Sequence, residues 1–205
     1  MIEITNEDNM ELMARYEDNY FDLAIVDPPY GIGEKGHCRT RKKHNYKVKH
    51  IAKNWDDEIP TKEYFEQLFR VSKNQIIWGA NYMTEFIPPS MGWVFWDKKI
   101  GGDFSDGELA FTSFNRALKI VIKWNGNNGI PRIHPTQKPE YLYKWLLENY
   151  ATKGDKILDT HLGGGSIAIA CHDYKFDLTA CEIDTDYFNA ALKRLKIAQS
   201  QTKLF

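Results

Sequence analysis

Residues 156–170 read KILDTHLGGGSIAIA: a short apolar run that ends in an acid, then a glycine-rich turn, then small apolar residues. The apolar run is typical of a buried strand, and the residues from Ser166 onward are typical of a helix. Glycine lets backbone N–H groups approach a ligand closely, and the amino terminus of a helix attracts negative charge. The segment therefore predicts a strand–turn–helix unit with a ligand site in its turn.

A second acid adds to this prediction. Glu182 ends the next apolar run and follows Asp159 by 23 residues. A carboxylate at that place can accept hydrogen bonds from both hydroxyls of a ribose. The two acids favour an adenosine-containing cofactor over a turn that only reverses the chain. Gly163, Gly165 and Ala168 also satisfy the G-x-G-x-x-G/A pattern of dinucleotide-binding proteins.

Apolar runs and helical patterns alternate along the rest of the chain. We expect further strands at 21–26, 75–78, 92–96, 117–124 and 177–182, and helices at 61–71, 139–150, 166–174 and 186–199. This alternation predicts an α/β fold in which helices cover both faces of a mostly parallel sheet. Ligands of such sheets bind beyond the carboxyl ends of the strands. Four acids fall at such ends: Asp27, Asp97, Asp159 and Glu182.

The composition limits the class of protein. The chain has 205 residues, of which 42% are hydrophobic and 27% are charged, and its formal net charge is −1. We expect one domain over residues 1–205, and the balanced charge excludes a uniformly basic nucleic-acid coat. Three cysteines without a CxxC pair argue against a disulfide framework and a cysteine-based zinc site. No apolar run approaches the roughly 20 residues of a membrane span. We expect a cytoplasmic protein that binds no metal and no membrane.

Asp27-Pro28-Pro29-Tyr30 follows the predicted strand 21–26 and is the most specific motif in the chain. Two prolines cannot continue a central strand, so the chain must turn there. The turn leaves the Asp27 carboxylate and the Pro28 carbonyl as neighbouring acceptors, which suit the two donors of a planar –NH2 group. The Tyr30 ring offers a flat face on which a base can stack. A strand-end turn with an exposed tyrosine is the alternative.

Residues 37–53 read HCRTRKKHNYKVKHIAK and contain seven Lys or Arg, three His and no acid. We expect a mobile loop whose cations contact nucleic-acid phosphates beside a base at Tyr30. A solvated loop without a ligand is the alternative. Loops within residues 98–132 are further candidates for DNA contacts. The predicted phosphate contacts are Arg39, Arg41, Lys42, Lys43 and Lys47.

The order of three motifs resembles that of the β-class of S-adenosylmethionine-dependent DNA amino-methyltransferases. The motifs are the turn at 27–30, His134-Pro135-Thr136-Gln137-Lys138-Pro139, and the glycine turn after Asp159. In this class the catalytic motif precedes the cofactor motif, and lesser matches extend the resemblance over about residues 21–195. The resemblance implies a circularly permuted, Rossmann-like class I methyltransferase fold. The small size and residues 104–110 are similar to phage or prophage enzymes, so a bacterial or phage-infected cell is expected.

The resemblance also implies roles for individual residues. The catalytic turn would be Asp27, Pro28, Pro29 and Tyr30, with the first two holding the target amine and the tyrosine stacking on a flipped base. The residues that would contact S-adenosylmethionine are Asp159, His161, Gly163, Gly165, Ser166, Glu182, Thr136 and Lys138. The chain departs from the family pattern at Thr160 and His161, where Pro and Phe are usual, and at Gly164, where Ser is usual.

The implied activity is site-specific methylation of double-stranded DNA after base flipping, as in restriction-modification systems. Asp-Pro-Pro-Tyr is more common in relatives that modify adenine N6, and Ser-Pro-Pro-Tyr in those that modify cytosine N4. Adenine is therefore expected, with cytosine N4 as the alternative. Similar RNA and protein-glutamine methyltransferases mostly have Asn-Pro-Pro-Tyr and the unpermuted order.

Two more distant alternatives fit fewer of the motifs. A dinucleotide-dependent oxidoreductase would leave the motifs at 27–30 and 134–139 unexplained. A degenerate, non-catalytic DNA-binding subunit does not fit the presence of Asp27, Tyr30 and Glu182. Related enzymes are often dimers, so a homodimer is compatible with the resemblance.

Overall fold

The computed structural model describes residues 1–33, 56–99, 105–122 and 133–201. Within these residues, eight strands form one sheet in the order β1-β8-β7-β2-β3-β5-β4-β6. The strands are β1 (Ile2–Thr5), β2 (Phe21–Val26), β3 (Ser72–Trp78), β4 (Trp93–Asp97), β5 (Gly107–Thr112), β6 (Lys119–Ile122), β7 (Lys156–Asp159) and β8 (Asp177–Cys181). The helices are α1 (Asn9–Ala14), α2 (Lys62–Val71), α3 (Glu140–Tyr150), α4 (Ser166–Tyr174), α5 (Thr185–Ser200) and a short 3-10 helix, η1 (Ala80–Tyr82).

Most neighbouring strands run parallel. β1, β8, β7, β2 and β3 pair in parallel, and β6 pairs in parallel with β4. Only β5 runs the other way among these strands, because it pairs antiparallel with both β3 and β4. The carboxyl ends of β2, β7 and β8 therefore meet at one edge of the sheet, where ligands of such folds bind.

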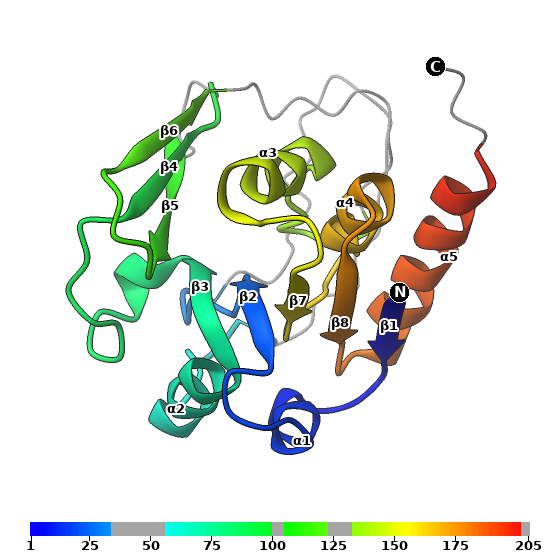
Figure 1. Ribbon diagram of the computed structural model, residues 1–205, viewed down its shortest axis with the longest axis horizontal. Coiled ribbons are helices and arrows are strands. Elements are labelled where there is room, and N and C mark those ends of the chain that lie inside the picture. The colour runs from blue at the N-terminus through cyan, green and yellow to red at the C-terminus, as the bar shows by residue number, and fades with distance from the viewer. Residues whose placement is uncertain (34–55, 100–104, 123–132, 202–205) are drawn as a thin grey trace.

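Helices cover both faces of the sheet, and each face has its own apolar core. Figure 1 shows α1 and α2 on one side of the row of strands and α3 and α4 on the other. Within β2, Leu23 and Ile25 pack with α3 and α4, whereas Ala24 and Val26 pack with α1 and α2. A strand buried on both faces reads as a continuous apolar run, and this explains why the sequence of β2 does not alternate.

The predicted fold class is confirmed: the sheet is mostly parallel and helices lie on both of its faces. The expected strands and helices are present, and β2, β7 and α4 have the predicted bounds. Of the strand expected at 117–124, β6 covers 119–122, and residues 123 and 124 lie outside the described part. The sequence patterns missed β1, α1 and β5. Within the described residues, no helix has both the length and the apolar character of a membrane span.

Candidate active site

The turn after β2 is held by hydrogen bonds on both of its sides. The Tyr30 hydroxyl donates to Asp27 Oδ1 at 2.8 Å, so the ring folds back over the end of the strand. From the other side, Asp56 Oδ1 accepts from the backbone N–H of Tyr30 at 2.6 Å and of Gly31 at 3.1 Å. The Asp56 residue is 2% exposed. These contacts fix the direction in which the Asp27 carboxylate points.

A row of four charged side chains ends at this carboxylate. Lys138 Nζ lies 2.5 Å from Asp27 Oδ1 and 3.0 Å from Glu108 Oε2, and it donates to the Tyr30 hydroxyl at 3.0 Å. Lys98 Nζ lies 2.5 Å from the other oxygen of Glu108. Acid and base alternate along the row, and the side chain of Lys138 is 2% exposed. Sequence analysis identified Asp27, Tyr30 and Lys138 as site residues but missed Glu108, Lys98 and Asp56.

Burial and ion pairing together set the charges of this row. Burial raises the pKa of Asp27 above its usual value, although Lys138 opposes the rise. Burial alone would raise the pKa of Glu108, but Lys138 and Lys98 outweigh it and lower that pKa to about 2. Burial alone would lower the pKa of Lys138, but its two acidic partners outweigh it and raise that pKa. Glu108 and Lys138 are therefore both charged at neutral pH.

The Tyr30 ring also has a fixed neighbour on one face. It stacks on Tyr82 of η1 with a centroid distance of 5.2 Å and an interplanar angle of 16°. Gly79 makes room for this packing: its φ is +66°, and a Cβ there would lie 2.0 Å from Tyr30 Cε1. Tyr82 is 48% exposed. Stacking of a base on Tyr30 stays a prediction, and one face of the ring already carries Tyr82.

The glycine turn lies beyond the carboxyl ends of β7 and β8. Gly163 and Gly165 have φ values of +52° and +70°, in the region that favours glycine. Glu182, just after β8, accepts from the Gly163 N–H at 2.8 Å through Oε2. Asp159, the last residue of β7, accepts from the backbone N–H of His161 at 3.0 Å through Oδ1. The structure thus brings the two predicted cofactor acids to either side of this turn.

Gly165 has a packing role in addition to its conformation. It immediately precedes α4, and a Cβ there would lie 2.9 Å from the Cβ of Ala191 on α5. By contrast, a Cβ on Gly163 would meet only the His134 ring, at 3.8 Å or more. Gly163 therefore leaves the more open surface for a ligand, and Gly165 allows α5 to approach the turn.

Residues 134–138 connect the glycine turn with the predicted catalytic turn. The His134 ring lies beside Gly163, and the Gln137 side chain lies against Gly164. Thr136 Oγ1 lies 3.2 Å from His134 Nδ1. The structure directs the Lys138 ammonium to Asp27 and Glu108, and contact of Lys138 or Thr136 with a cofactor stays a prediction.

The departures at Thr160 and His161 form a partly buried polar network. The Thr160 hydroxyl lies 2.7 Å from the Tyr64 hydroxyl and 2.9 Å from His161 Nδ1. Asn9 Nδ2 lies 3.1 Å from His161 Nε2. Burial lowers the pKa of His161 to about 4, so its ring is neutral at physiological pH. Both ring nitrogens have protein partners, and the ring ties the glycine turn to α1 and α2.

The chemistry of these residues fits S-adenosylmethionine. Asp159 is 2% exposed, and burial raises its pKa to about 8. A nearby cation favours the ionised form of a buried carboxyl, and the cofactor carries both an ammonium and a sulfonium. Gly163 leaves its ligand side open, and the carboxylate of Glu182 can accept further hydrogen bonds, since each carboxylate oxygen has two lone pairs.

The remaining predicted contacts lie at or beyond the edges of the described residues. Arg39, Arg41, Lys42, Lys43 and Lys47 lie outside them, as do parts of the loops within 98–132. The Gly33 N–H donates to the Asp56 carbonyl at 2.9 Å, and Asp56 in turn contacts Tyr30 of the predicted catalytic turn. Asp97 pairs with Lys99 at 2.7 Å, and it is Lys98 that reaches the charged row.

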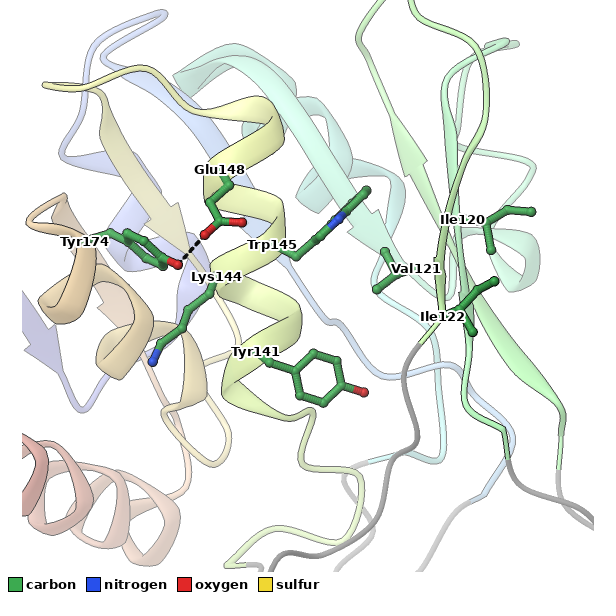
Figure 2. A pocket seen from close by; sticks show the side chains of 8 residues that line it. All are labelled: Ile120, Val121, Ile122, Tyr141, Lys144, Trp145, Glu148 and Tyr174. Atoms are coloured by element: carbon green, nitrogen blue, oxygen red, sulfur yellow. Dashed lines mark hydrogen bonds between the residues drawn. The ribbon is translucent and has the colours of Figure 1, made fainter.

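A hollow elsewhere on the molecule is distinct from this site. It has a volume of about 350 Å³ and lies between β6 and α3 (Figure 2). Figure 2 shows Ile120 and Ile122 on one side, Tyr141 and Trp145 on the other, and a hydrogen bond between Tyr174 and Glu148. None of the predicted catalytic or cofactor residues lines it.

Comparisons of the sequence connect the chain with known proteins. The sequence model of the DNA methylase family matches residues 75–193. Type II methyltransferase M.HpaI of Haemophilus parainfluenzae is 24% identical over 234 residues, which covers 91% of this chain and 71% of that protein. Type II methyltransferase M2.DpnII of Streptococcus pneumoniae is 33% identical over 101 residues, which covers 49% of this chain and 35% of that protein.

Solved structures share the fold. The complex of M1.HpyAVI with S-adenosylmethionine has a TM-score of 0.64 at 18% identity, over 95% of this chain and 99% of that one. The cytosine-N4-specific PvuII DNA methyltransferase has a TM-score of 0.61 at 11% identity, over 94% of this chain and 86% of that one. At these identities the likeness establishes the α/β methyltransferase fold.

Proposed function

We propose that this chain methylates the N6 amine of adenine in double-stranded DNA. The chain belongs to the DNA methylase family and is an S-adenosylmethionine-dependent DNA methyltransferase. The observation that carries this proposal is the state of the Asp27 carboxylate. Its Oδ1 accepts from Tyr30 and pairs with Lys138. Its Oδ2 has no hydrogen-bond partner among the described residues, and the side chain is 17% exposed. One oxygen is thus anchored and the other is available to a substrate.

A second acceptor lies next to it in the chain. Among the described residues, no group donates a hydrogen bond to the Pro28 carbonyl. We assign Asp27 Oδ2 and the Pro28 carbonyl to the two N–H groups of the target amine. Hydrogen bonds from both N–H groups draw the nitrogen toward tetrahedral geometry and localise its lone pair, which adenine otherwise delocalises into the ring.

The bound cofactor supplies an electrophilic methyl group on a sulfonium. The chain supplies alignment and charge, because positive charge develops on the amine nitrogen as it gains the methyl group. The methylated amine then releases one proton, and Asp27, whose pKa burial raises, is placed to accept it. Neither a covalent enzyme intermediate nor a metal takes part in this scheme.

We assign the cofactor to the glycine turn. Asp159 would face its cationic methionine end, Gly163 and Gly165 would cradle it, and Glu182 would accept from its ribose hydroxyls. His161, whose ring nitrogens have protein partners, would contribute packing. Further contacts are assigned to Thr136 and Ser166. The buried, raised-pKa carboxyl of Asp159 is the main support for this assignment.

The DNA-binding part of the proposal rests on the chain near the catalytic turn. The cations within 37–53 follow that turn in sequence, and Gly33 and Asp56, which precede and follow them in the chain, are joined by a hydrogen bond beside the turn. We propose that these cations contact phosphates around a flipped base. We also propose that residues 1–205 act as one catalytic domain of the permuted β-class, as the order of the three motifs indicates.

The choice of adenine rests on the aspartate that begins the catalytic motif, and cytosine N4 is the second candidate. The similar PvuII enzyme is cytosine-N4-specific, so this fold can accommodate the cytosine amine. The deciding experiment transfers tritiated methyl from S-adenosylmethionine to unmethylated duplex DNA and separates the digested nucleosides. Label in N6-methyldeoxyadenosine is the expected result. Label in N4-methyldeoxycytidine would overturn the choice of base, and label in neither would overturn the proposed substrate.

A further inference from the structure

Glu108 lies in the active site although it belongs to none of the motifs that define it. It is the second residue of β5, and β5 is the strand that runs antiparallel to its neighbours. Its Oε2 lies 3.0 Å from Lys138 Nζ and 3.4 Å from the Tyr30 hydroxyl oxygen. The Glu108 side chain is 22% exposed, whereas the Lys138 side chain between the two acids is 2% exposed.

We propose that Glu108 is a positioning residue for methyl transfer: it holds the Lys138 ammonium in the one place from which that ammonium anchors Asp27 Oδ1 and leaves Oδ2 open. The inference rests on the proposed role of Asp27 as the acceptor of the target amine. It adds one residue, on a separate strand, to the site residues that come from the two sequence motifs.

The geometry of the ammonium supports this assignment. An ammonium group has three N–H donors, and Lys138 has three acceptors: Asp27 Oδ1 at 2.5 Å, Glu108 Oε2 at 3.0 Å and the Tyr30 hydroxyl at 3.0 Å. A lysine side chain is long and flexible, so a single ion pair does not fix its end. Without Glu108 the ammonium would be free to move across both oxygens of Asp27 and to occupy the one that the substrate needs.

The charges along the row point to the same role. If Glu108 were absent, Asp27 would be the only acid of the row left to balance the positive charge of Lys138. Lys98 would also lose its partner at 2.5 Å. Glu108 also contributes to the raised pKa of Asp27, after burial and against Lys138. Removing its charge should therefore strengthen the hold of Lys138 on Asp27 and lower the pKa of the catalytic carboxyl.

The kinetic test compares Glu108→Ala and Glu108→Gln with a matched control, Asp173→Asn. Asp173 on α4 pairs with Lys144 on α3 at 2.5 Å, and its side chain is 9% exposed, so it is a partly buried acid–lysine pair outside the site. We expect Glu108→Ala to lower kcat roughly 100-fold, the order expected for a displacement of about 1 Å in an active site. KM for DNA and Kd for the cofactor should stay close to wild type. Glu108→Gln keeps an oxygen for Lys138 and should lose less.

A pH profile separates positioning from stability. In Glu108→Gln the acid limb of the kcat profile should move to lower pH, because Asp27 ionises more easily, whereas Asp173→Asn should keep the wild-type limb and kcat. An unchanged limb in Glu108→Gln, or equal losses of kcat in Glu108→Ala and Asp173→Asn, would overturn the inference while leaving the proposed function intact.

An NMR titration keeps the test independent of activity. The carboxyl carbon of Asp27, labelled with carbon-13, should titrate at lower pH in Glu108→Gln than in the wild-type protein. If wild type methylates no nucleic acid but this shift is observed, the proposed function fails and the coupling of Glu108 to Asp27 stands. If the Asp27 titration is the same in both proteins, the inference fails whatever the activity.

Discussion

Two glycines with nearly the same backbone geometry allow the position of Tyr30 to be tested directly. Gly79 and Gly33 have φ values of +66° and +69°. Alanine at either position adopts a left-handed conformation, at a cost of roughly 1–2 kcal/mol. A Cβ at Gly33 would meet nothing within 4 Å, whereas a Cβ at Gly79 would lie 2.0 Å from Tyr30 Cε1. The two substitutions therefore share the backbone cost and differ in the displacement of Tyr30.

The size of that displacement follows from the contact distances. Ordinary van der Waals contact begins at 3.4 Å, so the Tyr30 ring must move by about 1.4 Å to accommodate Gly79→Ala. The hydrogen bond from its hydroxyl to Asp27 is 2.8 Å long and would be lost. A misplacement of about 1 Å in an active site can cost on the order of 100-fold in rate. We expect Gly79→Ala to lose roughly this factor and Gly33→Ala to keep near wild-type turnover.

The assay is single-turnover methyl transfer to duplex DNA at saturating cofactor, with chemical denaturation to compare the free energies of unfolding. Both variants should be destabilised by a similar backbone contribution, and only Gly79→Ala should be slow. Wild-type turnover by Gly79→Ala would refute the role given to Tyr30. So would an equal loss in Gly33→Ala, because that loss would come from the backbone alone.

Three further predictions concern the cofactor turn. Burial raises the pKa of Asp159 to about 8, and a cationic cofactor favours the ionised form. As the pH rises toward 8, the affinity for the cofactor measured by calorimetry should thus increase by up to about tenfold per pH unit. Asp159→Asn should lack this increase. Because burial lowers the pKa of His161 from 6.5 to about 4, the unfolded chain binds more protons there and stability falls as the pH drops through that window. Between pH 6.5 and 4, His161→Gln should lose less free energy of unfolding than the wild-type protein, and the difference should be up to about 3 kcal/mol in denaturant titrations. An identical loss in the two proteins would contradict the assignment. Arg194 donates to the Gly164 carbonyl and to Glu140 Oε1, the latter at 2.7 Å. Arg194→Ala should lower the free energy of unfolding by about 1.5–3 kcal/mol and weaken cofactor binding, and unchanged binding would separate Arg194 from the glycine turn.

Local patterns were sufficient to predict the elements that carry the two main motifs. β2 and β7 are short apolar runs ended by Asp-Pro-Pro or by a glycine turn, and α4 follows that turn directly. Their bounds are set by residues that lie next to them in sequence. The same local signals placed Asp27, Asp159 and Glu182 at the edge of the sheet where the structure has them.

The residues that sequence reasoning missed act across long separations. Glu108 meets Tyr30 across 78 residues, and Asp56 meets it across 26. β5 carries glycine and glutamate in its first two positions, so its pattern gave no clear strand signal. The edge strand β1 and the six-residue α1 are short elements that tertiary packing stabilises. Such contacts follow from the order of strands in the sheet, which local patterns do not specify.

The role of Lys138 is a further point on which the sequence prediction and the structure differ. The ion pair of Lys138 with Asp27 joins two motifs that sequence analysis assigned to different tasks, one to the cofactor and one to the substrate. Lysine fits either role by residue type, since a carboxylate of a ligand and a carboxylate of the protein attract it equally. Only the position of Glu108 on β5, where it pairs with both Lys138 and Lys98, favours the catalytic role.

The most direct test of the account is Asp27→Ala, measured for single-turnover methyl transfer to duplex DNA and, on the same preparation, for cofactor binding by calorimetry. Asp27 is assigned to the target amine and not to the cofactor, so methyl transfer should be lost while cofactor affinity and cooperative unfolding are retained. Methyl transfer at the wild-type rate by Asp27→Ala would contradict the account. Loss of cofactor binding in a folded variant would also contradict it, since Asp27 would then belong to the cofactor site.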